Sequence, residues 1–145
     1  MRIFLDTEFN GFRGELISIA LVPESVEHEV FYHILSLPDR IDPWVSENVI
    51  PVLYKVSFGV WDQTSTARED LREQLDDYLS DFYQPEIICD WPSDVEHFIG
   101  LMFGDSHAAT KYREISFSIV SQRYTSMVPH NALADAIALR DAYTS

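Results

Sequence analysis

The stretch R-I-F-L-D-T-E-F at residues 2–9 decides the fold, because it places two carboxylates inside an otherwise apolar run. A β-strand alternates its side chains between two faces, so Asp6 and Glu8 share one face of this stretch. Leu5, Thr7 and Phe9 share the other. Two neighbouring carboxylates repel and raise each other's pKa, and a divalent cation relieves that repulsion. Two solvated acids at an exposed strand end would explain the same short pattern. Residues elsewhere in the chain must therefore decide between a metal site and a solvated strand end.

The composition is typical of one folded domain. The chain has 145 residues, and at this length a protein buries about 68–70% of the surface that its unfolded form exposes. No run approaches the roughly 18 apolar residues of a membrane span, and the N-terminus carries no secretory signal. Cys89 is the only cysteine, which excludes an internal disulfide and a cysteine-based zinc site. We therefore expect a single domain over residues 1–145 in a soluble, cytoplasmic protein with no membrane partner.

The charge balance limits how the chain can bind nucleic acid. With 24 acidic and 10 basic residues, the formal net charge is -14. Proteins that bind duplex DNA use a basic surface, so this composition argues against a sequence-specific DNA-binding module. An enzyme that holds only a terminal nucleotide or two stays open, because bound metal can supply the positive charge.

The pattern of β-rich stretches predicts an α/β fold with a mixed sheet. Residues 2–9, 15–22 and 29–37 follow one another across turn residues and predict an antiparallel meander of three strands. Residues 86–91 form a buried strand that leads into a helix, which predicts a strand parallel to the first. Residues 115–120 supply a further strand. The nearly continuous apolar character of the first strands predicts that helices cover the sheet.

Four helices are predicted around this sheet. A short one starts at Pro43, because proline suits the first helical position. Two capping boxes, at residues 66–69 and 93–96, precede longer segments with apolar residues at helical spacing. Asn131 is expected to cap a last helix over residues 132–143.

Further acids stand where these helices begin. Asp94 lies in the first turn of the helix after the fourth strand, and Asp135 lies one turn into the last helix. His130 stands on the loop before that helix. A helix residue can hold a metal rigidly, while a loop histidine can move over the same place and accept a proton.

This arrangement resembles the DEDDh group of 3′→5′ exonucleases, which share an RNase H-like fold. The resemblance rests on D-T-E-F at residues 6–9, the aspartate at the head of the middle helix and H-x4-D at residues 130–135. The runs at 15–19 and 44–51 are similar to the small single-domain exoribonucleases typified by a mycobacterial member. The resemblance implies a site for two Mg²⁺ or Mn²⁺ ions held by four acids, with His130 as general base. Those acids are Asp6, Glu8, Asp94 and Asp135.

Two departures from the family pattern leave alternatives open. Family members often have an aromatic residue before the middle aspartate, whereas Ser93 stands there in this chain, and Asp90 competes as the third acid. Asp94 is preferred because a helix N-terminus favours a carboxylate in its first turn. The sequence also ends ten residues after Asp135, so we expect that a C-terminal element that relatives use to grip RNA or a second subunit is missing or supplied from elsewhere. A homodimer is left open.

Most other histidines and aromatic residues are expected to have structural roles. Trp91 is expected to pack in the core, although aromatic side chains can also stack on bases. The resemblance implies that Thr7 and Phe9 meet the terminal nucleoside. The remaining histidines are expected to be surface or hydrogen-bonded residues rather than ligands: His28, His33, His97 and His107.

The predicted function is a metal-dependent 3′→5′ exonuclease, an exoribonuclease by resemblance. It would hydrolyse the terminal phosphodiester at the 3′ end of single-stranded RNA or DNA with two metal ions and release a nucleoside monophosphate. His130 would take the proton from the attacking water. Two other classes stay open: a nucleotide- or RNA-end-binding module with little turnover, and a metal-dependent hydrolase of small nucleotides.

Overall fold

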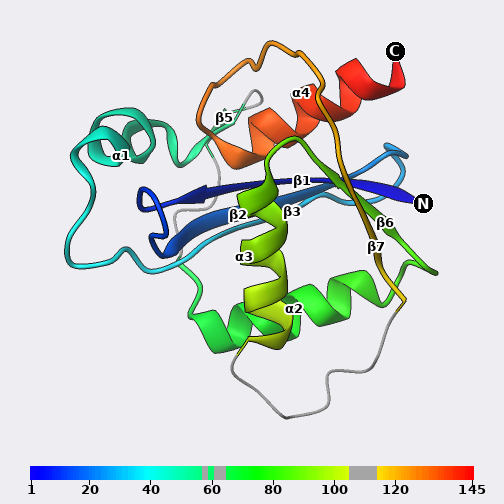
Figure 1. Cartoon of the computed structure of the whole chain (residues 1–145), viewed down its shortest axis with the longest axis horizontal. Coiled ribbons are helices and arrows are strands. Elements are labelled where there is room, and N and C mark those ends of the chain that lie inside the picture. The colour runs from blue at the N-terminus through cyan, green and yellow to red at the C-terminus, as the bar shows by residue number, and fades with distance from the viewer. Residues whose placement is uncertain (57–58, 61–64, 105–113) are drawn as a thin grey trace.

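The computed structural model describes residues 1–56, 59–60, 65–104 and 114–145. These residues form a five-stranded mixed sheet in the order β3-β2-β1-β6-β7 (Figure 1). The strands β1 (Arg2–Phe9), β2 (Leu16–Pro23) and β3 (Phe31–Ile34) make an antiparallel meander. The strands β6 (Glu86–Cys89) and β7 (Ser116–Ile119) continue the sheet in the direction parallel to β1. The predicted α/β fold, a meander extended by parallel strands as in RNase H-like sheets, is confirmed.

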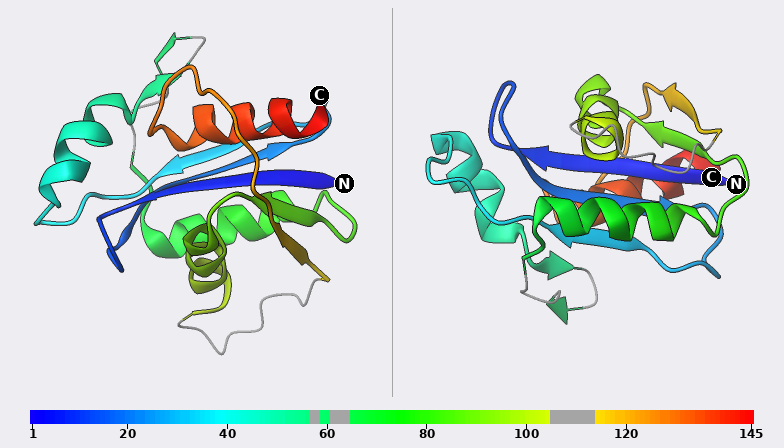
Figure 2. Two further views of the ribbon diagram at one scale, coloured as in Figure 1. Left: turned by 45° about the horizontal axis from the view of Figure 1, so that its top comes forward. Right: turned by 90° about the horizontal axis from the view of Figure 1, so that it is seen from below.

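Helices cover both faces of this sheet (Figure 2). On one face, α2 (Arg68–Leu79) and α3 (Pro92–Phe103) pack against Ile3 and Leu5 of β1. On the other face, α4 (Ala132–Thr144) and α1 (Pro43–Asn48) pack in a second cluster with Phe4. Successive residues of β1 therefore enter two different cores, which explains why its first half is apolar without alternation.

Neither predicted capping box forms. The helix α2 begins at Arg68, after Ala67 and without a side-chain cap. Thr66 instead forms a β-bridge with Leu35, and its hydroxyl lies 3.1 Å from Nδ1 of His33. The helix α3 begins at Pro92, so Ser93 lies inside the helix rather than ahead of it. Proline is pre-organised for the first helical position, and this preference outweighs the serine signal.

The predicted cap of α4 does form, and it also joins two segments. The Oδ1 atom of Asn131 accepts a hydrogen bond from the N–H of Ala134 at 3.0 Å. Its Nδ2 donates to the carbonyl oxygens of Val52 at 2.9 Å and Lys55 at 2.7 Å. These carbonyls lie in the short 3-10 helix η1 (Ile50–Val52) and in a two-stranded hairpin that the sequence pattern did not predict. The hairpin comprises β4 (Lys55–Val56) and β5 (Gly59–Val60).

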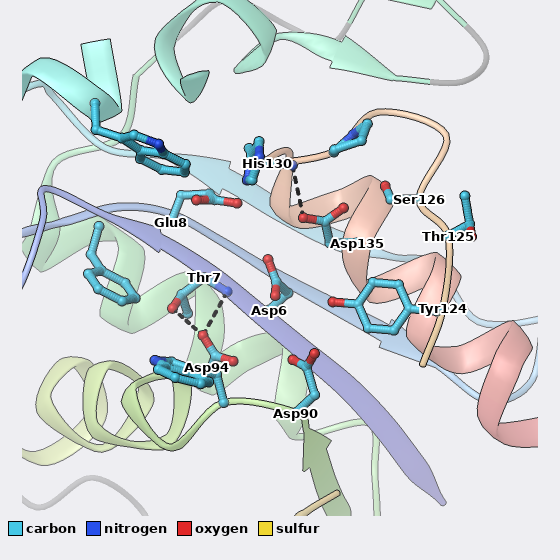
Figure 3. Close-up of a pocket in the computed structure, with 14 residues that line it drawn as sticks. Asp6, Thr7, Glu8, Asp90, Asp94, Tyr124, Thr125, Ser126, His130 and Asp135 are labelled. Atoms are coloured by element: carbon cyan, nitrogen blue, oxygen red, sulfur yellow. Dashed lines mark hydrogen bonds between the residues drawn. The ribbon is translucent and has the colours of Figure 1, made fainter. Parts of the chain in front are cut away.

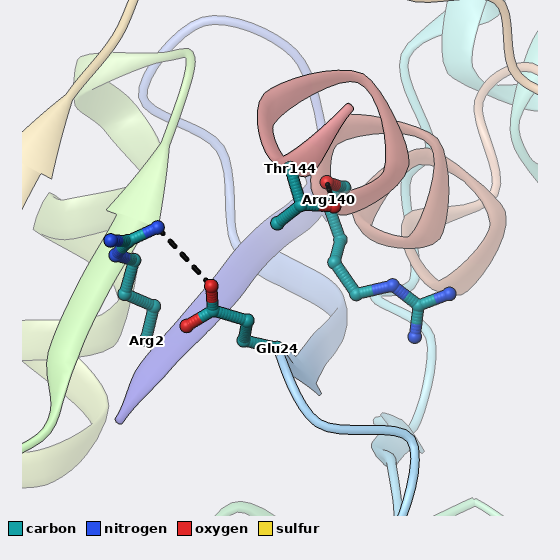
Figure 4. A network of polar contacts seen from close by, with 4 residues as sticks. All are labelled: Arg2, Glu24, Arg140 and Thr144. Atoms are coloured by element: carbon teal, nitrogen blue, oxygen red, sulfur yellow. Dashed lines mark hydrogen bonds and ion pairs between the residues drawn. The ribbon is translucent and has the colours of Figure 1, made fainter.

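The start of β1 carries an exposed ion pair. A guanidinium nitrogen of Arg2 lies 3.2 Å from a carboxylate oxygen of Glu24, just after β2 (Figure 4). On α4, Arg140 pairs with its neighbour Asp141 at 2.8 Å, and the hydroxyl of Thr144 donates to the carbonyl of Arg140. Exposed pairs of this kind contribute about 0–1 kcal/mol, so the fold depends on its two apolar cores. Within the described ranges, no helix has the length and apolar character needed to cross a membrane.

Candidate metal centre

The acidic residues meet where β6 stops short of the end of β1. β6 pairs with β1 only along Arg2–Phe4 and ends at Cys89, after which the chain turns into α3. The second half of β1 therefore has an open edge on that side. Asp94, in the first turn of α3, reaches this edge, and Asp135 approaches Asp6 and Glu8 from α4. The site thus combines residues from both helical layers.

The carboxylates form two groups with one common member. Asp6, Asp90 and Asp94 place one oxygen each within 4.8 Å of one another, and so do Asp6, Glu8 and Asp135. Figure 3 shows these side chains turned toward one shared space. Such clusters of carboxylate oxygens could hold metal ions. Both candidates for the third acid, Asp90 and Asp94, belong to the same group, so the geometry does not choose between them.

Three of the acids each keep a buried oxygen without a hydrogen-bond partner among the described residues. Oδ1 of Asp94 accepts from the N–H of Thr7 at 3.2 Å and from its hydroxyl at 2.6 Å, while Oδ2 has no partner. Oδ2 of Asp135 accepts from the N–H of His130 at 3.1 Å, while Oδ1 has none. Oδ2 of Asp6 is also unpartnered. Unpaired buried oxygens are costly, and cations held by the two carboxylate groups would give these oxygens partners.

The cluster holds protons at neutral pH when no metal is bound. Burial, with the nearby carboxylate of Asp94 as the next cause, raises the pKa of Asp6 well above its usual range. Burial and the charge of Asp135 raise the pKa of Glu8 to about 8. Burial raises the pKa of Asp94 to about 7, against the hydrogen bonds from Thr7. Burial also raises the pKa of Asp135, opposed by a hydrogen bond from Ser126. Metal binding would therefore release protons.

The acids line a cavity of about 720 Å³. No lysine or arginine is among its described lining residues. The segment before α4 contributes Tyr124, Thr125, Ser126 and Pro129, which the sequence pattern did not single out. Residues 121–130 show no apolar periodicity, so the sequence offered no signal for them. The hydroxyl of Tyr124 hydrogen-bonds Asp90, and burial raises the pKa of this tyrosine.

His130 borders the acid cluster but belongs to neither group of potential ligands. Its side chain is exposed, and its ring lies edge-on to Trp44 with 5.0 Å between centroids. Its backbone has φ +68°, a conformation that L-residues other than glycine adopt at a cost of roughly 1–3 kcal/mol. Such strain is concentrated at functional sites. The predicted base thus lines the cavity but lies outside the two carboxylate groups.

The other predicted residues have mixed outcomes. Both donors of Thr7 hold Asp94, and Phe9 packs on the ring of His97 at 4.7 Å, so their contacts with a nucleoside stay a prediction. The expected core position of Trp91 is wrong: 60% of this residue is exposed, because it immediately precedes α3 at the cavity. His28 packs on Phe82, and His33 contacts Thr66. His107 lies outside the described residues.

Comparison with known proteins does not assign this chain to a family. No protein-family model matches this chain, and no curated protein matches it. The fold and the acid cluster are therefore the observations from which a function can be inferred. Together they establish an α/β sheet with carboxylates that could hold metal.

Proposed function

We propose that this chain is a metal-dependent 3′→5′ exonuclease of the DEDDh kind that acts on single-stranded nucleic acid as one domain. The observation that carries the proposal is the pair of carboxylate groups sharing Asp6, with His130 beside them. The proposal is supported by the lining of one cavity at this sheet, which includes the four acids and the histidine that the resemblance names. Mg²⁺ or Mn²⁺ fits, because every donor is a hard carboxylate oxygen and three buried oxygens lack other partners.

Each residue then has a distinct task. Asp6 would contribute to both of two ion sites, Glu8 and Asp135 to one, and Asp94 or Asp90 to the other. Two such ions generate the nucleophile from water and stabilise the leaving oxygen of a phosphodiester. Thr7 holds Asp94 in place through two hydrogen bonds.

His130 would accept the proton of the attacking water through a ring nitrogen. Its exposed ring lines the cavity, and only its backbone N–H is hydrogen-bonded to the Asp135 carboxylate. The ring can therefore move without movement of Asp135. General bases must approach the proton that they take to hydrogen-bond distance, and an apo site often shows longer separations. The leaving group is the 3′ oxygen of the shortened strand, and the product is a nucleoside monophosphate. The preference for RNA comes from the resemblance.

The test is an incubation of the protein with Mg²⁺ or Mn²⁺ and substrates of three kinds. These are 5′-labelled single-stranded RNA, 5′-labelled single-stranded DNA, and mononucleotides. We expect stepwise shortening from the 3′ end, mononucleotide products and loss of activity in EDTA. Asp77→Asn, which removes an exposed acid of α2 away from the cavity, is the matched control for Asp6→Asn.

Four results would contradict the proposal. Internal fragments would indicate an endonuclease, and hydrolysis of mononucleotides alone would indicate a small-molecule hydrolase. Metal-dependent binding of RNA ends without turnover would indicate a binding module. Shortening of a strand whose 3′ hydroxyl is blocked, at an undiminished rate, would contradict the assigned polarity.

A further inference from the structure

Open surface continues from the acid cluster to a pair of arginines. A cavity of about 1110 Å³ adjoins the metal centre, and Arg13 and Arg68 lie among its lining residues. The two arginines also line a cavity of about 640 Å³ farther on. We call Arg13 and Arg68 the arginine pair, and the surface that joins it to the acids the groove. The residues shared by the groove and the metal centre are Glu8, Phe9, Trp44 and Trp91.

The loop that carries Arg13 is held in one conformation. Arg13 has φ +58° and Gly11 has φ +75°, in the turn between β1 and β2. A Cβ at Gly14 would lie 1.9 Å from the carbonyl oxygen of Asn10, so only glycine fits there. The Asn10 side chain donates to the carbonyl of Arg40 and accepts from the N–H of Asp42, each at 2.7 Å. The strained backbone of Arg13 is thus enforced by its surroundings.

Within the described part of the chain, Arg68 has no hydrogen-bond or ion-pair partner that would explain its position. It is the first residue of α2, where the helix dipole disfavours a cation. Its Nη2 atom lies 3.9 Å from the position that a Cβ at Gly100 would occupy, so the guanidinium group extends over α3. Among the described residues, neither member of the arginine pair has an ion-pair partner. Two guanidinium groups therefore stand unneutralised in a chain with net charge -14.

Exposed aromatic rings line the groove together with the arginine pair, and the guanidinium of Arg13 lies over the ring of Phe12. Phe12 is 91% exposed, Trp91 60% and Trp44 53%, and all three line the groove. Bases of single strands stack on such rings regardless of sequence. The groove also contains Asp42, whose carboxylate caps α1, and Glu96 next to His97. The groove thus offers guanidinium groups that suit phosphates and aromatic rings that suit bases, the two components of a single strand.

From this geometry we infer that the groove binds the part of a single strand on the 5′ side of the terminal nucleotide. The arginine pair contacts its backbone phosphates, and the exposed rings contact its bases. This inference rests on the proposed function, because it takes the terminal phosphodiester to lie at the acid cluster. Binding in the groove would make an oligonucleotide of several nucleotides the preferred substrate. The arginine pair would also give this acidic protein a local cationic site for a polyanion.

The test compares wild type with the double variant Arg13→Gln/Arg68→Gln. The control is Arg72→Gln, which removes one positive charge one turn after Arg68 in α2, from a residue that lines neither cavity. The first measurement is kcat/KM for a decanucleotide and a dinucleotide of the same sequence. We expect the ratio of the two values to fall about tenfold in the double variant, through KM, because charge-assisted hydrogen bonds to phosphate are lost. Arg72→Gln should keep the wild-type ratio.

The second measurement does not need turnover. Binding of 5′-fluorescein-labelled (rA)10 and (dA)10 is measured by anisotropy in EDTA over a range of salt concentrations. Loss of two phosphate contacts should reduce the slope of log K against log salt by about 1.4, since each single-strand contact contributes about 0.7. Arg13→Lys/Arg68→Lys, which keeps the charge, should restore most of that slope.

The outcomes separate the two proposals. An unchanged length ratio and an unchanged salt slope in the double variant would overturn the role of the groove, while the exonuclease activity would stand. Absence of hydrolysis with either substrate in wild type would overturn the proposed function. In that event a reduced salt slope in the double variant would still support single-strand binding in the groove.

Discussion

Asp6 is the residue on which both carboxylate groups depend, since each group includes one of its oxygens. Asp6→Asn removes the shared anion, so we expect turnover to fall to the background level. The amide also relieves repulsion within the metal-free cluster, so the melting temperature in EDTA at pH 8 should not fall. Single-turnover assays and thermal melts measure the two effects. Full activity of this variant at saturating Mn²⁺ would contradict a shared acid at the metal centre.

The backbone N–H of His130 donates a hydrogen bond to the carboxylate of Asp135. Substitutions of the two residues should nevertheless have different effects on turnover and metal affinity. His130→Ala should lower turnover by roughly 10²–10⁴-fold, the usual effect of a lost proton-transfer group, and leave metal affinity nearly intact. Asp135→Ala should damage both. Calorimetric metal titrations and single-turnover rates make the comparison, with His28→Ala as the control, because His28 does not line the cavity. Equal loss of metal affinity in the two variants would show that His130 is a ligand.

The residue pattern predicted some of this site and missed other parts for identifiable reasons. The period of two in β1 was sufficient to place Asp6 and Glu8 together, as their group with Asp135 shows. It could not separate Asp90 from Asp94, because the turn from β6 into α3 brings both to Asp6. Trp91 belongs to an apolar stretch and therefore suggested burial, but the strand ends at Cys89 and leaves it exposed.

Asn131 is fully buried at the start of α4, the helix that carries Asp135, and its side chain joins this helix to η1 and β4. Asn131→Ala loses the helix cap and leaves the carbonyls of Val52 and Lys55 without this donor. We expect the free energy of unfolding to fall by about 2–4 kcal/mol, from the cap and the unpaired buried groups together. Activity should fall as well, because α4 positions Asp135. Urea denaturation measures the first effect.

Asn48→Ala is the matched control for this substitution. Its side-chain amide is a hydrogen-bond donor to the carbonyl of Trp44 near the surface of α1, so the change should stay within about 0.5 kcal/mol. Asn131→Asp adds a second comparison, because it keeps the cap acceptor and loses the Nδ2 donors. A cost for Asn131→Ala no larger than that for Asn48→Ala would show that the contacts to Val52 and Lys55 contribute little.

Element types were easier to predict than element ends. Strands and helices follow from apolar periodicity, which tertiary contacts reinforce. Caps depend on single side chains, and at both failed capping boxes another interaction competed successfully. Thr66 forms a β-bridge with Leu35 and a hydrogen bond with the ring of His33. Pro92 starts α3 one residue before Ser93. The hairpin of β4 and β5 has two-residue strands, which are too short to show a period.

At the scale of the whole molecule, the site arises from an interruption in the sheet. β1 is the central strand, buried between two helical layers, and only its second half lacks β6 as a neighbour. Carboxylates from α3 and α4 converge on that gap from opposite faces. The sequence predicts the five strands of this sheet, the antiparallel meander and a strand parallel to the first, but the length of β6 relative to β1 depends on where α3 starts. That detail decides whether the acids meet, so the cavity could not be predicted from the pattern alone.

The last prediction concerns stability as a function of pH, where the acids act together. In the unfolded chain these carboxylates titrate near pH 4, whereas burial raises the pKa of Glu8 to about 8 and that of Asp94 to about 7. Between pH 4 and pH 8 the metal-free folded state therefore binds more protons than the unfolded state. The free energy of unfolding must then fall as pH rises through this window. Glu8→Gln/Asp94→Asn should flatten the fall, because these two groups no longer titrate.

Metal should reverse that loss. Ions bind the deprotonated acids of the folded state, so added Mg²⁺ or Mn²⁺ should stabilise the protein more at pH 8 than at pH 5.5. At a metal concentration a hundred times Kd, the stabilisation of about 2.7 kcal/mol corresponds to a rise of roughly 5–10 °C in melting temperature. Thermal melts at both pH values, in EDTA and in millimolar metal, measure the effect, and the double variant is the control. A metal-free stability that is flat or rises from pH 5 to pH 8, together with no response to metal, would mean that these acids are solvated surface groups and that no metal centre forms.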